Sequence, residues 1–239
     1  MKKIIKLAVL FISVVTTLTF SFGISAETRW HQWELHKRDG ATSVYTRYVE
    51  DYQLKAFKIS TVLKAPLASV MAIIGDVEGA PKWMHLCRTL DMVSQPNAKG
   101  EFVSYMVTNS PWPVKDRDVY IQNNFFQDPE TFEIIMSGKP ASGFDQVKNR
   151  VRIPDMYHQW RITPLDYNTT RLELIGHGNP GGWIPKWIAN WVATGMPEET
   201  FRNIEQMIQL DKYKVDQAEQ IVGTFNFNVS FPQQNFALN

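Results

Sequence analysis

The chain has 239 residues, with 25 lysines and arginines against 24 acidic residues and a formal net charge of +1 at pH 7. Such a balanced chain gives no electrostatic reason to expect nucleic acid as a partner or strong attraction to anionic lipid. Cys87 is the single cysteine in the sequence, so an internal disulfide is excluded and side-chain packing must stabilise the fold.

The N-terminus has the layout of a secretory signal peptide over residues 1–26. Three lysines precede an apolar run over residues 7–24, and Ser25-Ala26 offers a small-residue cleavage site. The run is close to the roughly 20 residues that span a bilayer, so a retained membrane anchor is the alternative. The polar chain after Ala26 favours cleavage, which removes three lysines and no acid and changes the net charge to −2. We therefore expect a periplasmic or secreted product.

The mature chain is expected to begin with one short helix and two strands. Residues 28–38 suit a short helix that docks its tryptophans on the body of the protein. Residues 42–49 and 54–64 are expected to be strands, because apolar and polar side chains alternate in the second of them. The turn between these strands is expected near residues 51–52.

A helix is predicted to begin at Pro66, which suits the first helical position because its missing N–H removes no hydrogen bond there. Apolar residues recur at helical spacing as far as Val77. Gly75 and residues 79–81 (Gly-Ala-Pro) are expected to weaken or end this helix, and a short aromatic segment follows over residues 82–86.

The middle of the chain is expected to form one antiparallel sheet. Turn-forming residues, including Lys139-Pro140 and Pro164-Leu165-Asp166, separate successive apolar segments. Neighbouring strands joined by short turns pair in antiparallel fashion. The predicted strands are residues 88–94, 101–109, 117–126, 131–137, 149–163 and 169–178. Strands flanked by isolated helices indicate the α+β class.

A long helix is predicted to close the domain. Residues 180–182 (Pro-Gly-Gly) form a turn, Pro185 again suits the first helical position, and an apolar face continues to Ile208. Pro197 lies inside this helix, so we expect a kink near residues 194–197. A sheet of about eight strands curls on its own twist, and an aromatic helix against its concave side would leave an apolar space.

The C-terminal residues 211–239 are treated as an extension of the domain. Residues 211–222 suit a polar helix, and residues 224–231 alternate strictly between apolar and polar side chains. The alternating segment would add to a sheet edge of this domain or of a partner, or else form a loosely ordered terminus.

Three segments resemble the START lipid-binding domain of the helix-grip superfamily. They are residues 112–119 (WPVKDRDV), residues 160–164 (WRITP) and residues 179–190 (NPGGWIPKWIAN), in the family's order and spacing. The likeness extends over about residues 30–210, and we assign the domain to residues 27–210. The resemblance implies a helix-grip fold, in which a curved antiparallel sheet wraps around a long C-terminal helix and holds a lipid or sterol in an internal hydrophobic cavity.

Arg117 is the candidate polar residue of such a cavity. It shares strand parity with Val119 and Ile121, so it would place a guanidinium in an apolar space, where a charge needs a partner. The resemblance implies that this arginine can pair with an acid and meet a polar ligand group, but the sequence does not identify the acid. The alternative is that Arg117 or Asp118 anchors the strand and the proline-rich loop before it.

The remaining ligand-binding candidates are apolar. They are Trp187, Ile188, Trp191, Val192 and Met196 on the last helix, with Trp160 and Met84 from the sheet and the aromatic segment. Their alternative is ordinary core packing of an amphipathic helix, and the resemblance is what turns this face into a cavity wall.

No sequence motif for a metal, a cofactor or a catalytic group is present. The five histidines form no His-Glu-x-x-His pair, and Cys87 has no nucleophile signature. We expect a non-catalytic, monomeric protein that binds one hydrophobic small molecule, for lipid carriage or sensing, with transient membrane contact. The alternative is a helix-grip enzyme of the polyketide cyclase or hydratase type, which would have to use Arg117, His158, His177 and an unidentified carboxylate.

Overall fold

The computed structural model describes residues 32–49, 55–215, 229–234 and 236–237 of the chain. The predicted signal peptide and the turn near residues 51–52 lie outside the described residues. Within the described part of the chain, no helix is long and apolar enough to cross a membrane.

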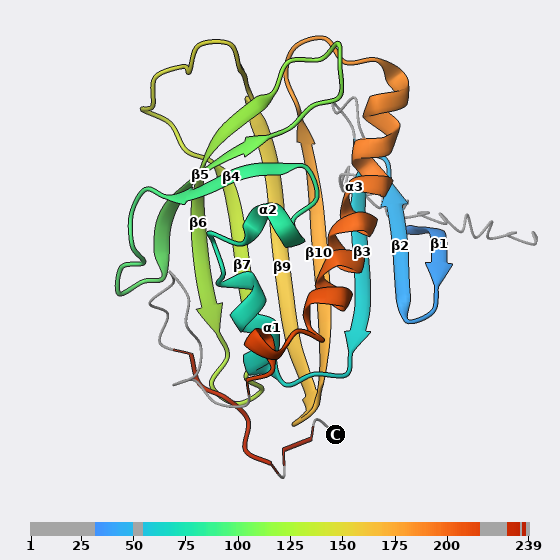
Figure 1. The fold of residues 1–239 in the computed structure, drawn as a ribbon, viewed down its shortest axis with the longest axis vertical. Coiled ribbons are helices and arrows are strands. Elements are labelled where there is room, and N and C mark those ends of the chain that lie inside the picture. Colours follow the sequence, from blue (N-terminus) through green and yellow to red (C-terminus); the bar gives the residue numbers. More distant parts are fainter. Residues whose placement is uncertain (1–31, 50–54, 216–228, 235, 238–239) are drawn as a thin grey trace, which may run out of the picture.

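A ten-stranded sheet dominates the described chain (Figure 1). Its strands are β1 (Glu34–Asp39), β2 (Thr42–Arg47), β3 (Ala56–Leu63), β4 (Cys87–Met92), β5 (Glu101–Thr108), β6 (Arg117–Gln127), β7 (Ile134–Pro140), β8 (Val151–Arg152), β9 (Asp155–Asp166) and β10 (Thr169–Asn179). Nine of them follow the order β1-β2-β3-β10-β9-β7-β6-β5-β4 with antiparallel pairing throughout, and β8 pairs with β6 in parallel. The predicted α+β class is confirmed.

The predicted helix over residues 28–38 is wrong, because residues 34–39 form β1. This strand makes a hairpin with β2, in which Asp39 pairs with Thr42 around a turn where Gly40 has a φ of +55°. Ladder hydrogen bonds to β2 outweigh the local helical preference, as tertiary pairing commonly does. Trp33 still contacts the neighbouring strand, since the Arg47 guanidinium lies 4.4 Å from the centroid of its ring, and Trp30 lies outside the described residues.

The predicted strand over residues 149–163 is two strands. Pro154 lies between β8 and β9, and β8 turns aside to pair with the start of β6 through Val151 and Arg117. The predicted turn at residues 164–166 is also wrong, because β9 continues to Asp166. Pro164 is tolerated there because it faces Thr170 at a register shift and lies beyond the end of the β7 ladder.

Three helices lie on one face of the sheet (Figure 1): α1 (Leu67–Ile74), α2 (Ala80–Trp83) and α3 (Lys186–Met207). Pro66 and Pro185 are the residues just before α1 and α3, with extended ψ values of 154° and 141°, rather than the first helical residues. The helix α3 continues through Pro197 to Met207. The kink at this proline stays a prediction.

The hydrophobic core is closely packed where the C-terminal half of α3 meets the sheet. Phe201 is fully buried and stacks on Trp160 at 5.9 Å, and Trp83 meets the same Trp160 edge-on at 6.2 Å. Ile204 and Ile162 complete this layer without exposed surface. This end of α3 is therefore held by close aromatic packing.

The C-terminal extension packs along the domain where it is described. The predicted helix over residues 211–222 is replaced in its described part by a short 3₁₀ turn over Asp211–Tyr213. The chain leaves helical geometry there because Tyr213 and Lys212 both donate to the Asp76 carboxylate, at 2.6 and 2.9 Å. Further on, Ala237 forms a β-bridge with Asp166.

Most of the predicted strand over residues 224–231 lies outside the described residues. Its described end is held by Ser230, whose backbone N–H and carbonyl both bond the Gln127 side chain at 2.8 Å.

Candidate ligand-binding cavity

A cavity of about 270 Å³ lies between the helix-covered face of the sheet and the N-terminal half of α3. Strands β5, β6, β9 and β10 supply one wall, and the α2–β4 segment and α3 supply the other. Most lining side chains are apolar. The volume is close to the lower end of the roughly 300–1,000 Å³ typical of small-molecule sites.

Two glycines deepen the wall that the sheet provides. Gly138 and Gly176 both pair with His158 from either side, in one row across β7, β9 and β10. A Cβ on Gly138 would lie 2.4 Å from the His158 ring, and a Cβ on Gly176 would lie 2.6 Å from the ring of Phe57. The row therefore needs residues without side chains, and the space that they leave admits the neighbouring rings.

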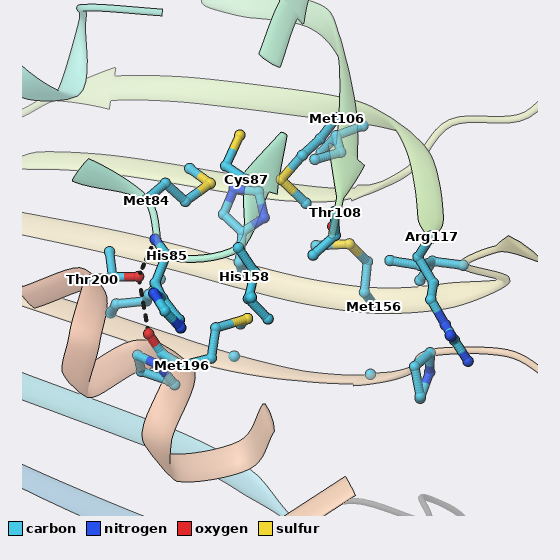
Figure 2. Close-up of a pocket in the computed structure, with 18 of the residues that line it drawn as sticks. Met84, His85, Cys87, Met106, Thr108, Arg117, Met156, His158, Met196 and Thr200 are labelled. Carbon is cyan, nitrogen blue, oxygen red and sulfur yellow. Dashed lines mark hydrogen bonds between the residues drawn. The ribbon is translucent and has the colours of Figure 1, made fainter. Parts of the chain in front are cut away.

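Five methionines line the cavity, namely Met84, Met106, Met136, Met156 and Met196. Figure 2 shows four of them gathered around the pocket from α3, the sheet and the segment after α2. Methionine has three rotatable bonds and a polarizable sulfur, so such a wall adapts to ligands of different outline. The sequence prediction included Met84 and Met196 and missed the three on strands, which share inward parity with their apolar neighbours.

Arg117 connects two loops at one end of the cavity. Its guanidinium donates to the carbonyl oxygens of Lys115 at 2.5 Å and Gly181 at 3.2 Å, with longer contacts to the Trp183 carbonyl and the Ser110 hydroxyl at 3.5 Å. The side chain is buried, with 4% of its surface exposed. Burial lowers the pKa of Arg117, and the Asp116 carboxylate opposes that shift. These contacts agree with the alternative in which Arg117 anchors the strand and the proline-rich loop before it.

Asp118, the neighbour of Arg117, points to the other face of the sheet. It is fully buried and forms an ion pair with Arg152 at 2.9 Å, and it accepts a hydrogen bond from the Tyr105 hydroxyl. Among the described residues, Arg117 donates its hydrogen bonds to carbonyl and hydroxyl oxygens, so the acid expected as its partner is not among the groups that accept from the guanidinium there.

The loops that Arg117 holds carry two of the most exposed tryptophans. Trp112 is 89% exposed in the loop before β6, and Trp183 is 73% exposed in the loop before α3. Residues of both loops, including Pro111 and Ile184, line the cavity. Loops rather than strands therefore cover this end of the cavity, which makes it the candidate entrance.

Burial disfavours the charged form of three titratable groups that line the cavity, His158, His177 and Cys87. Burial lowers the pKa of His158 to about 4 and also lowers the pKa of His177. Burial raises the pKa of the Cys87 thiol to about 11, which makes that thiol a poor nucleophile at neutral pH. At the other wall, Thr200 donates to the Met196 carbonyl and accepts from the backbone N–H of His85, both at 3.0 Å (Figure 2).

Comparison with known protein families identifies the family to which this fold belongs. A model of the START domain matches residues 24–212. The chain belongs to the START domain family. The sheet, the three helices and the cavity under α3 are the helix-grip arrangement that the resemblance implied.

Several START relatives match most of the chain. An uncharacterized protein of Pseudomonas aeruginosa is 27% identical over 183 residues, which cover 77% of this chain and 90% of that protein. The phosphatidylcholine transfer protein of Bos taurus is 26% identical over 171 residues, covering 69% of this chain and 79% of that protein. A solved STAR-related lipid transfer protein fragment from Xanthomonas axonopodis is 26% identical, with a TM-score of 0.66 over 74% of this chain and 99% of that one.

Human StAR-related lipid transfer protein 5, at 15% identity, shares the fold with a TM-score of 0.64 over 74% of this chain and 86% of that one.

Five of the eight ligand-binding candidates lie at the START cavity of this chain. Arg117, Ile188, Met196, Trp160 and Met84 all line it, and their contact with a ligand stays a prediction. The placement of Trp187 on the wall is wrong, because this side chain is 60% exposed and lies outside the lining. The side chains of Trp191 and Val192 lie outside those that the structure describes.

Proposed function

We propose that this protein is a non-catalytic lipid carrier of the periplasm or of the extracellular space. The observation that carries the proposal is the apolar cavity beneath α3, one end of which is covered by loops rather than by packed strands. Shielding a lipid from water stabilises the complex by about 0.8 kcal/mol per buried CH₂, so an apolar wall suffices for binding. The names of the phosphatidylcholine transfer and STAR-related lipid transfer relatives support carriage.

Carriage is favoured over catalysis by the pKa values of two titratable groups in the cavity, His158 and Cys87. General acid–base catalysis works best with groups whose pKa values lie near the working pH. His158 and Cys87 have pKa values moved away from neutrality, in opposite directions, to about 4 and about 11. The Arg117 guanidinium is committed to backbone carbonyls at the entrance.

Export follows from the signal peptide predicted over residues 1–26. The proposed route of lipid exchange is transient contact of the entrance with a membrane, through the exposed tryptophans Trp112 and Trp183. Tryptophan prefers the boundary between acyl chains and headgroups, where its ring is apolar and its N–H can be solvated.

Binding of the fluorescent apolar probe 1-N-phenylnaphthylamine tests the function. The delipidated protein should bind the probe in a saturable way and release it when lipid extracted from the host envelope is added. Met136→Trp, which fills the cavity, should weaken probe binding at least tenfold, whereas Val93→Trp, at a 45% exposed position, should not. Equal binding by the two variants would contradict carriage in this cavity.

A further inference from the structure

Two of the polar side chains that line the cavity, Asn123 and His158, lie close together over Gly138. We propose that Asn123 and His158 form a subsite that recognises the hydroxyl group of an uncharged lipid. This rests on the proposed function, and it names the class of lipid that the cavity takes: an apolar body with a single hydroxyl, either a fatty alcohol or a fused-ring alcohol.

Hydrogen bonds fix the orientation of the Asn123 amide. Its Nδ2 donates to the backbone carbonyl of Ile121 at 3.0 Å and to the Ser104 hydroxyl at 2.9 Å. Because a carbonyl oxygen can only accept, the nitrogen must be on that side and Oδ1 on the other. Asn123 has 4% of its surface exposed and lines the cavity. Across the described part of the chain, no group donates to Asn123 Oδ1.

His158 approaches the same point from the neighbouring strand. The position that a Cβ on Gly138 would take lies 2.9 Å from Asn123 Oδ1 and 2.4 Å from Cε1 of His158. Both polar groups therefore lie over one glycine, which leaves them room to face the cavity. A neutral imidazole offers one N–H donor and one acceptor nitrogen. No side chain or backbone group among the described residues bonds the ring of His158.

A ligand hydroxyl satisfies both groups at once. It can donate to Asn123 Oδ1 and accept from the His158 N–H. A buried polar group without a partner is costly, so a molecule that supplies the missing bonds gains over one that does not. Water can take this place in the empty protein, and the ligand hydroxyl then replaces its hydrogen bonds.

Anionic and two-chain lipids fit the subsite less well. A carboxylate or phosphate offers acceptors to the acceptor Oδ1 of Asn123, and a buried anion needs a cation. Of the two cations that line the cavity, Arg117 already bonds the carbonyls of Lys115 and Gly181, and the Lys55 ammonium lies 4.8 Å from the centroid of the Tyr48 ring. The volume of about 270 Å³ favours one compact apolar body over two acyl chains.

Competition against 1-N-phenylnaphthylamine tests the subsite with defined ligands. The delipidated protein is titrated with 1-dodecanol and cholesterol, and with the matched analogues dodecane, 1-methoxydodecane, dodecanoate and cholestane. At least one alcohol should compete about ten- to a hundredfold better than its hydrocarbon, as expected for two buried hydrogen bonds. The methyl ether should lose most of this advantage because it cannot donate to Asn123, and dodecanoate should compete no better than dodecane at pH 7.

Variants assign the preference to the two residues. His158→Phe and Asn123→Leu should each reduce the advantage of the alcohol to less than threefold while still binding the fluorescent probe, which also shows that each variant folds. Thr108→Val removes another hydroxyl from the cavity wall and should keep the full preference. If one variant fails to fold, the other variant and the wild-type ligand series still show whether the subsite recognises a hydroxyl group.

The outcomes separate this subsite from carriage itself. Probe binding with displacement by every apolar ligand and no preference for a hydroxyl would overturn the subsite and leave the carrier function standing. A preference that survives both variants would also overturn it. Failure of the wild-type protein to bind the probe or any lipid would overturn the carrier function as well.

Discussion

The Arg117 guanidinium donates to backbone carbonyls on two loops that are far apart in the sequence. Arg117→Met keeps an apolar stem but removes these charge-assisted bonds, each worth about 1.5–3 kcal/mol. We expect amide hydrogens in residues 110–115 and 180–184 to exchange at least tenfold faster, while β9 exchanges as before. Hydrogen exchange followed by mass spectrometry measures this, with Arg171→Met at an exposed position of β10 as the control. Unchanged exchange in both loops would show that Arg117 does not hold the entrance.

His158 makes the stability of the domain depend on pH. Burial lowers its pKa to about 4 from 6.5. Between these values the unfolded chain binds a proton that the folded protein does not, so the free energy of unfolding falls as the pH is lowered through this window. We expect His158→Phe to remove about 2–3 kcal/mol of the stability loss between pH 7 and pH 4.5. Urea unfolding at the two pH values measures it, and the exposed His36→Phe should retain the loss.

For single residues, the sequence predicts which strand positions face the cavity but not which groups their side chains bond. The parity of β6 correctly places Arg117 on the cavity face, together with Ile121. Its acceptors are carbonyls of loops, whose conformation no periodic pattern encodes. Trp187 was misplaced for a related reason: helical periodicity marks a broad face, and the face of α3 turns from the cavity to solvent within one residue of Ile188.

At the scale of elements, the loop before α3 depends on glycine. Gly182 has a φ of +62°, and a Cβ there would lie 3.4 Å from Val151, so Gly182→Ala strains the closed loop by about 1–2 kcal/mol. If this loop moves to release the ligand, the bound lipid should dissociate about five- to thirtyfold faster. Gly143→Ala introduces the same kind of strain at a φ of +88° in an open loop. It should lower stability similarly without changing the release rate of 1-N-phenylnaphthylamine in stopped-flow experiments. Equal release rates in the two variants would argue against a moving loop.

Most strands could be predicted from alternation and turn residues, and the errors have common physical causes. The first predicted helix became β1 because pairing with a neighbouring strand, invisible in a local window, satisfies its backbone. Two predictions around Pro154 and Pro164 were wrong: a strand was expected through Pro154, and a turn was expected at Pro164. One proline divides β8 from β9, and the other lies inside β9 beside a bulge. The meaning of a proline depends on whether the adjacent strand needs its N–H, which only the sheet order reveals.

Across the whole molecule, packing is divided along α3. Its C-terminal half is tied to the sheet by the buried stack of Phe201 on Trp160, while its N-terminal half faces the cavity through Ile188 and Met196. A domain of this kind can loosen one end while the other end remains packed. The lipid-binding cavity could be expected from a long helix against a curled sheet. The polar pair at Gly138 could not, since it depends on the register of three strands.

The asymmetry of the molecule also predicts how it meets a membrane. The exposed rings of Trp112 and Trp183 lie on loops that Arg117 connects beside the entrance. If the entrance faces the bilayer, both rings should insert at the headgroup boundary. The double variant Trp112→Ala, Trp183→Ala should then bind neutral phosphatidylcholine vesicles at least tenfold more weakly and exchange lipid more slowly.

The matched control for this surface removes two exposed apolar side chains elsewhere. Leu35 on β1 and Phe126 on β6 are each 53% exposed. The side chain of Phe126 lies on the opposite face of β6 from the residues that line the cavity. Because the chain has a formal net charge of +1, vesicle binding should depend on these tryptophans more than on salt. Vesicle co-sedimentation at 50 and 500 mM salt measures both effects. Equal losses in the two double variants would mean that the membrane recognises exposed apolar surface in general and not the entrance of the cavity.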